Sequence, residues 1–141
     1  SDTLKEFGVK HRMFILSAHR TPKEVVKRVK ESEENGVKVF IAAAGMAAHL
    51  AGAIAAQTTK PVFGIPLGGG DLDGVDSLLA TVQMPKGVPV ATFAIGKSGA
   101  INAALCAVQV LGITDKKIAE QLIDYKSKMH DDVLAANESI Q

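Results

Sequence analysis

Four apolar segments, each followed by a segment with helical character, constrain the fold of this chain more than any other feature. The apolar segments cover residues 11–16, 37–43, 61–65 and 88–93, and the helical ones cover 22–35, about 47–57, 76–83 and 96–111. Regular alternation of this kind predicts an α/β domain with a parallel sheet and right-handed crossovers. We therefore expect a three-layer α/β/α, doubly wound, flavodoxin-like sheet, followed by a C-terminal helix over 115–135.

The individual segments sharpen this prediction. Residues 37–43 are continuously apolar, which is typical of a parallel strand buried on both faces. In the first long helix the pattern places Val25, Val26 and Val29 inward, and the following Asn-Gly pair ends the helix. Residues 3–8 read as the last turns of a helix, but no strand precedes them, although a βαβ arrangement calls for one.

Composition limits the possible partners. The chain has 141 residues, 47% of them hydrophobic, which fits a single domain with its own core. A net charge of +1 and an aromatic content of 4% argue against a nucleic-acid partner. The apolar run at 99–113 is too short and too interrupted to cross a membrane. A single cysteine excludes an internal disulfide, and we expect a reducing, cytoplasmic environment.

The first candidate site lies where the segment 11–16 gives way to a helix. Ser17, Ala18, His19 and Arg20 stand at this junction and are followed by Thr21-Pro22. Thr21 as N-cap, Pro22 at the first helical position and Glu24 three residues after Thr21 predict a capping box. Loops between a strand's carboxyl end and a helix's amino end bind anions in open α/β sheets, so a functional role for His19 and Arg20 is favoured.

Two further loops should meet this one, because the carboxyl ends of parallel strands share one edge of the sheet. The predicted loops are 17–20, 44–49 and 64–70, and the second contributes His49 at the start of a helix. A helix amino end favours the neutral imidazole, which can shuttle a proton. For His49 taken alone, a buried histidine bonded to a backbone carbonyl is the more common explanation.

Other motifs are weaker. The Gly68–Gly70 run could cradle a phosphate but is more typical of a flexible loop, and Lys97-Ser98 lacks the first glycine of a P-loop. Asp71, Asp73 and Asp76 lack further nearby ligands, so we expect no metal site. Cys106 lies in an apolar helix and is expected to be a small buried residue rather than a nucleophile.

Five ordered motifs strongly resemble the 5-(carboxyamino)imidazole ribonucleotide mutase family of bacterial purine synthesis. The motifs read Ser-Ala-His-Arg-Thr-Pro at 17–22, Ala-Ala-His-Leu at 47–50, Asp-Ser-Leu-Leu with Val-Gln-Met-Pro at 76–85, Gly-Val-Pro-Val-Ala-Thr at 87–92 and Ala-Ile-Gly through Asn-Ala-Ala-Leu at 94–105. The resemblance as a whole spans residues 3 to 134. Arg20 and the Ala-Ala-His-Leu run resemble the mutase class rather than the related carboxylase class that uses free carbon dioxide.

The resemblance implies an isomerase that moves a carboxylate from the exocyclic nitrogen of the substrate to the adjacent ring carbon. His19 would be the general acid and base, and Arg20 would bind the ribonucleotide phosphate. The backbone from Ala44 to Ala48 would form a cage that retains carbon dioxide, and His49 would border it. The remaining substrate-binding residues would be Ser17, Ala18, Ala44, Gly45, Met46, Ala47, His49 and Leu50. The family also implies a homo-octamer, and the reaction needs no metal or other cofactor.

The sequence departs from the family in three places. Met46 stands where the family usually has Gly, and Ala51 where it usually has Pro. The strand and the Gly-Ser-x-Ser-Asp loop with which the family opens have no counterpart here. We therefore expect residues 1–141 to form one mutase domain that is incomplete at its N-terminus, binds nucleotide poorly and turns over slowly.

Three alternatives stay open. One is a flavodoxin-like module that binds flavin or another nucleotide, although one Tyr and five Phe leave few rings to stack on a flavin. A second is the carboxylase of the related class. The third is a scaffold that only assembles, which the apolar helix at 99–111 would suit.

Overall fold

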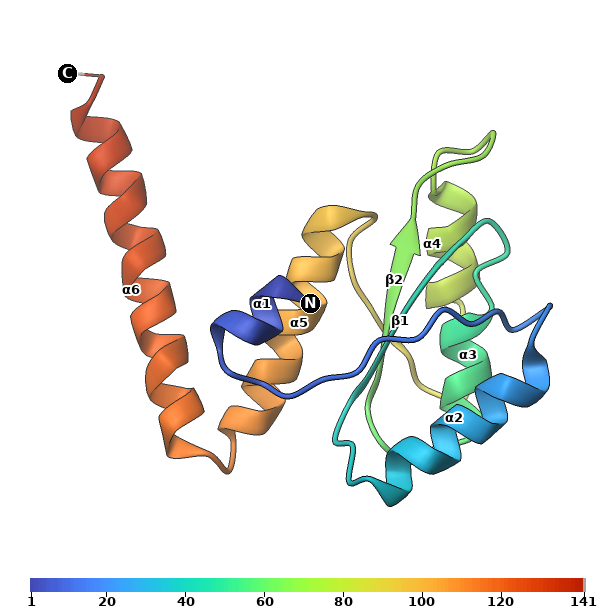
Figure 1. Ribbon diagram of the computed structural model, residues 1–141. Coiled ribbons are helices and arrows are strands. Elements are labelled where there is room, and N and C mark those ends of the chain that lie inside the picture. The colour runs from blue at the N-terminus through green and yellow to red at the C-terminus, as the bar shows by residue number, and fades with distance from the viewer. Residues whose placement is uncertain (141) are drawn as a thin grey trace. The chain divides into compact units, whose positions relative to one another are not determined.

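The computed structural model describes residues 1–140 and shows an α/β chain with nine regular elements in that range (Figure 1). In chain order they are α1 (Asp2–Glu6), α2 (Pro22–Glu34), β1 (Phe40–Gly45), α3 (Leu50–Ala55), β2 (Val62–Leu67), α4 (Val75–Val82), β3 (Ala91–Thr92), α5 (Lys97–Gly112) and α6 (Lys116–Glu138). The chain divides into two compact units, one of residues 11–104 and one of residues 1–10 together with Leu105 onward.

The sheet belongs to the unit 11–104 and has the order β1-β2-β3, with every neighbouring pair parallel. The register runs from Phe40 opposite Val62 to Gly45 opposite Leu67, and Gly64 lies opposite Thr92. Residues 62–66 of the central strand β2 are all buried. The predicted α/β class with a parallel sheet and C-terminal helices is confirmed, with three strands in the described part of the chain.

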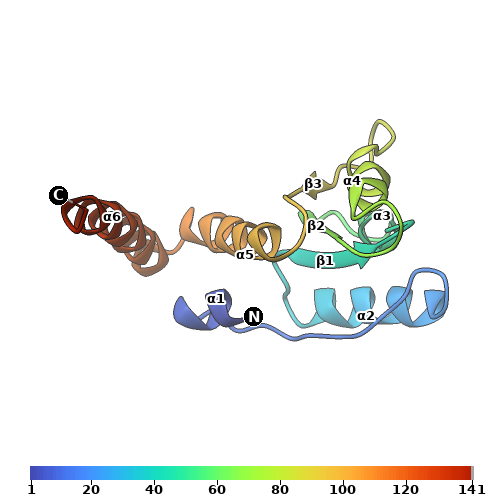
Figure 2. The same ribbon diagram turned by 90° about the horizontal axis from the view of Figure 1, so that it is seen from above.

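The core of this unit joins its first helix to the sheet. Buried side chains from α2, β1, α3 and β2 form one cluster, made up of Val25, Val29, Ala42, Ala51, Ile54 and Val62. Leu16 packs against this cluster from the segment that precedes α2. Figure 2 shows α2 lying alongside β1, with that preceding segment continuing past it. The burial of Leu16 therefore fixes the chain just before the loop that carries His19.

The predicted strand over residues 11–16 does not form, and this prediction is wrong. The segment joins no ladder, and it exposes Met13 (75%) and Ile15 (103%). The Phe14 ring lies 5.2 Å from the guanidinium carbon of Arg28 in α2, so this side chain contacts the helix that follows. An apolar pattern favours a strand, but a strand also needs a neighbour for its peptide groups. No described strand takes that position beside this segment.

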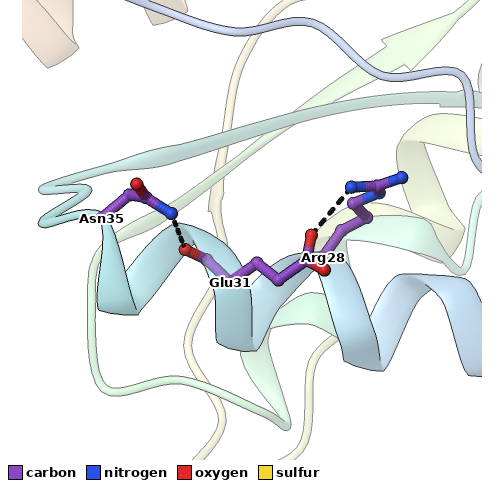
Figure 3. A network of polar contacts seen from close by, with 3 residues as sticks. All are labelled: Arg28, Glu31 and Asn35. Atoms are coloured by element: carbon purple, nitrogen blue, oxygen red, sulfur yellow. Dashed lines mark hydrogen bonds and ion pairs between the residues drawn. The ribbon is translucent and has the colours of Figure 1, made fainter.

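Polar contacts fix the far end of α2 (Figure 3). Arg28 Nη1 donates to Glu31 Oε2 at 2.7 Å, and Asn35 Nδ2 donates to the Glu31 carbonyl oxygen at 2.6 Å. The same carbonyl oxygen also accepts from the Asn35 backbone nitrogen at 3.1 Å, so Asn35 holds the last turn of α2 with two bonds. Gly36 follows with φ 75°, which confirms the predicted Asn-Gly stop.

Several boundaries and burial states differ from expectation. β1 begins at Phe40 and buries only Ala42, while Ala43 is exposed, so the predicted burial on both faces is wrong. Within the described residues β1 is the edge strand of the sheet. Val26 is 48% exposed instead of inward, and β3 shrinks to two residues because Val88 is bonded into a turn with Pro85 and Pro89 has no N–H.

The second unit contains α1, the second half of α5 from Leu105 onward, and α6. The rings of Phe7 and Tyr125 lie 5.5 Å apart within it. α6 begins at the N-cap Asp115, whose carboxylate accepts from the backbone nitrogens of Lys117 and Ile118 at 3.0 and 3.2 Å. No residue of α6 is buried. Among the described residues, none of the helices combines the length and the apolar character that a bilayer span needs.

Candidate active site

A closed turn at residues 17–21 presents the first candidate histidine. The Ser17 carbonyl oxygen accepts from the Thr21 backbone nitrogen at 2.9 Å and from the Thr21 hydroxyl at 3.1 Å. The Ser17 hydroxyl accepts from the Arg20 backbone nitrogen at 3.1 Å. These bonds tie both ends of the turn, so His19 and Arg20 project from a defined backbone. Both side chains are exposed.

The start of α2 is partly as predicted. Thr21 is the N-cap and Pro22 occupies the first helical position, as expected. The capping box is absent, because the Thr21 side chain makes no cap hydrogen bond. Its hydroxyl is bonded to both backbone groups of Ser17 instead. The hydroxyl that the pattern assigned to the helix therefore stabilises the turn that carries His19.

The second loop links β1 to α3 and is strained. Met46 and Ala48 have φ of 55° and 36°, a region that residues other than glycine seldom adopt. The Ala48 nitrogen donates to the Gly45 carbonyl oxygen at 3.0 Å, and Ala48 is only 4% exposed. Strain of this kind is often found at functional sites. The loop places His49 at the N-cap of α3, with Leu50 as the first helical residue.

The third loop, from Gly68 to Gly74, approaches the second. A Cβ built on Gly70 would lie 3.7 Å from Met46 Cγ, and one built on Gly45 would lie 3.5 Å from the Leu67 carbonyl oxygen. The ends of β1 and β2 are thus neighbours, as expected at one edge of a parallel sheet. Gly70 itself has φ 75°.

The central feature of the site is a direct contact between two imidazole rings from different loops. His19 Nε2 lies 2.7 Å from His49 Nδ1, a hydrogen-bonding distance. The ring centroids are 4.7 Å apart and the ring planes are inclined by 71°. Two rings 30 positions apart in sequence therefore meet where the segment 11–16 and β1 end. Joined imidazoles can hold and pass a proton.

The other predicted site residues surround this pair to different degrees. Arg20, Met46 and Ala47 are exposed, whereas the remaining predicted positions are partly buried: Ser17, Ala18, Ala44, Gly45 and Leu50. A guanidinium exposed beside a histidine offers a set of fixed donors to an anion. Sequence reasoning missed the direct contact between the rings and the functions of Thr21 and Ala48. Because alanine seldom adopts a positive φ, nothing in the sequence indicated the backbone conformation of Ala48.

The weaker sequence motifs make no hydrogen bond with His19 or His49 in the described residues. Asp76 lies in the first turn of α4, where a negative charge is favourable, and its Oδ1 accepts from the Ser77 nitrogen at 2.9 Å. Residues 1–140 contain no group of three or more His, Cys, Asp or Glu side chains arranged to hold a metal ion. Cys106 is a free thiol that is partly buried in α5.

Comparison of the sequence with known proteins identifies relatives that belong to one enzyme family. A family model described as AIR carboxylase matches residues 1–132. An N5-carboxyaminoimidazole ribonucleotide mutase of Saccharolobus solfataricus is 48% identical over 95% of this chain and 84% of its own length. The Escherichia coli K12 protein of the same name is 51% identical over 90% of this chain and 75% of its own length.

Two further matches extend the comparison. A phosphoribosylaminoimidazole carboxylase of Candida albicans is 47% identical over 98% of this chain, which corresponds to 24% of that longer protein. The crystal structure of Treponema denticola PurE superposes with a TM-score of 0.89 at 26% identity, covering 99% of this chain and 86% of the other.

Proposed function

The chain belongs to the AIR carboxylase family, and on this premise we propose that it is an N5-carboxyaminoimidazole ribonucleotide mutase, an isomerase of de novo purine biosynthesis. The observation that carries the proposal is near 50% identity to proteins of that name over at least 90% of the chain. The paired imidazoles of His19 and His49 supply the kind of group that such a reaction requires.

The reaction moves one carboxylate within the substrate. Protonation of the exocyclic nitrogen releases carbon dioxide, the adjacent ring carbon recaptures it, and the proton left on that carbon is then removed. His19 gives the first proton and takes the second, because an imidazole exchanges protons readily near neutral pH. Arg20 binds the phosphate of the ribonucleotide through its charged donors.

The loop 44–48 forms the wall that retains carbon dioxide between the two steps. Its small residues let the backbone come close to a small molecule, and the strained φ angles of Met46 and Ala48 support a fixed shape. His49 and Leu50 border this wall, and Ser17 and Ala18 complete it from the other loop. The reaction proposed here uses no metal and no other cofactor.

The wider context of the site is also a proposal. We propose that residues 1–141 act as one mutase domain of the three-layer, doubly wound, flavodoxin-like type, in a homo-octamer located in the cytoplasm. The match to the Treponema denticola structure supports the fold. The exposed apolar side chains of α6, among them Ile123 (68%), Val133 (68%) and Leu134 (49%), support assembly. Sedimentation at micromolar concentration tests it, and a monomer there would contradict it.

The first test is conversion of the carboxylated substrate by the unmodified chain. We expect slow but measurable formation of the carbon-carboxylated product. His19→Asn should fold normally and lower turnover by about 10²–10⁴, the usual contribution of a general acid or base. His130→Asn, which changes an exposed histidine of α6, should leave turnover unchanged. Failure of the unmodified chain to form product would refute the proposal.

A second candidate function is the carboxylase reaction, because one relative at 47% identity is named a carboxylase. Labelled bicarbonate separates the two reactions. A mutase keeps the carboxylate of its substrate and incorporates little label into product, whereas a carboxylase starts from the uncarboxylated nucleotide and incorporates label fully. A flavin-binding module would instead give a yellow protein with no turnover of either nucleotide.

A further inference from the structure

The distance between the two imidazoles limits how many protons they can hold. At 2.7 Å, His19 Nε2 and His49 Nδ1 have room for one shared proton, because two N–H groups facing each other would repel. One ring donates and the other accepts. The remaining nitrogens, His19 Nδ1 and His49 Nε2, are the two points at which the pair can exchange protons with anything else.

We propose that His49 is a positioning and relay residue for His19, a proposal that rests on the mutase function above. In the form ready for reaction the pair carries one extra proton, with the shared proton on His49 and a proton on His19 Nδ1. His19 Nδ1 gives its proton to the exocyclic nitrogen of the substrate while the shared proton moves from His49 Nδ1 to His19 Nε2. Both rings are then neutral.

The second step reverses these movements. His19 Nδ1 takes the proton from the ring carbon, and the shared proton returns from His19 Nε2 to His49 Nδ1. The pair ends with the three ring protons and the single positive charge with which it began, so no external acid or base is consumed. Two protons move in each step, and His49 carries the positive charge on the side away from the reacting atoms.

His49 is the residue placed for this role. It supplies the imidazole bonded to His19, and the neighbouring Arg20 cannot give up its proton. The backbone that supports His49 is well defined, since Ala48 is buried with φ 36° and its nitrogen is bonded to Gly45. A ring held this way also fixes the orientation of His19, so that Nδ1 rather than Nε2 faces outward.

Solvent isotope effects in mixtures of light and heavy water test the relay. For the unmodified chain we expect a curved dependence of kcat on deuterium fraction, because two protons move together. His49→Asn, whose amide can keep a hydrogen bond but cannot carry the extra proton, should lower kcat by about 10- to 100-fold, with KM little changed and a linear dependence. His49→Ala should recover activity when free imidazole is added. His130→Asn should keep the curved dependence.

A measurement without substrate tests the contact itself. In the chain labelled with ¹⁵N-histidine, His19 Nε2 and His49 Nδ1 should show coupling across the shared hydrogen bond, and His49→Asn should abolish it. Absence of coupling, a linear isotope dependence in the unmodified chain, or full kcat in His49→Asn would each overturn the relay. These outcomes differ from failure of the mutase function, which would appear as no product from the unmodified chain.

Discussion

The hydroxyl of Thr21 bonds to both backbone groups of Ser17, donating to its carbonyl oxygen at 3.1 Å and accepting from its nitrogen at 2.9 Å. These two bonds close the turn from which His19 projects. The side chain of Thr21, four residues along the sequence, thus supplies two of the four bonds that fix the backbone at the proposed acid and base.

Replacement of Thr21 by Val should open this turn while keeping the shape of the side chain. We expect the free energy of unfolding to fall by about 1–2 kcal/mol, the usual value for losing two hydrogen bonds of this kind. The kcat should fall as well, because His19 loses its fixed position. Thr21→Ser keeps the hydroxyl and is the matched control. Denaturant unfolding and steady-state kinetics measure both effects, and an unchanged kcat in Thr21→Val would argue against positioning by this turn.

Arg20→Ala should weaken nucleotide binding without changing the fold. Loss of a charge-assisted contact to phosphate is expected to raise Kd by about tenfold or more. Lys23→Ala removes a nearby exposed cation from the first turn of α2 and serves as the control. Calorimetric titration with the ribonucleotide compares them. Equal affinities for the two variants would place the phosphate at another position.

Met46→Gly should stabilise the chain, because Met46 adopts a φ of 55°. The left-handed conformation costs a residue with a side chain about 1–2 kcal/mol, which glycine does not lose. Glycine is also more flexible in the unfolded chain, and this flexibility cancels part of the stabilisation. A net increase of about 0.5–1 kcal/mol in unfolding free energy is expected. Ala47→Gly, at a neighbour without positive φ, should instead lower stability. If both variants lose stability equally, the backbone of Met46 is unstrained.

Gly64→Ala should be strongly destabilising. A Cβ there would meet Thr81 Cγ2 and would lie 3.0 Å from Val90 Cγ1 in the buried centre of β2. Overpacking of this kind costs about 1–3 kcal/mol. Adding Thr81→Ser removes the clashing methyl group and should recover part of the loss. Gly52→Ala in α3, where the new methyl would meet only the flexible Met84 side chain at 3.4 Å, should be neutral or stabilising.

Local sequence patterns were enough to predict much of this chain. Helix starts and stops such as Pro22, Asn35 and Gly36 follow from backbone chemistry that each residue carries by itself, and the predicted positions hold. The alternation of apolar and helical segments gave the parallel sheet. Three of the four predicted strands are present: the apolar β2 is buried over residues 62–66, and β1 and β3 pair with it on either side.

The errors arise where structure depends on a partner that sequence does not reveal. Residues 11–16 have a strand pattern, but pairing needs a second strand beside them. The capping box failed for a similar reason, because Ser17 competes with the helix for the hydroxyl of Thr21. The contact between His19 and His49 depends on the angle between two loops, which no spacing rule specifies. The roles assigned to the site residues stay predictions.

The edge position of β1 gives its backbone two populations of amide hydrogens. The Phe40 nitrogen donates toward β2, to the Pro61 carbonyl oxygen at 2.9 Å, and the direction alternates from one residue to the next along a strand. Within the described residues β1 has a strand neighbour on that side only. Amides of Ala42 and Ala44 should therefore exchange with deuterated water slowly, whereas those of Ile41 and Ala43 should exchange early. The exchange rates of successive β1 amides would then alternate between fast and slow. If all β1 amides exchanged slowly, a further strand would cover the open edge of β1 in solution.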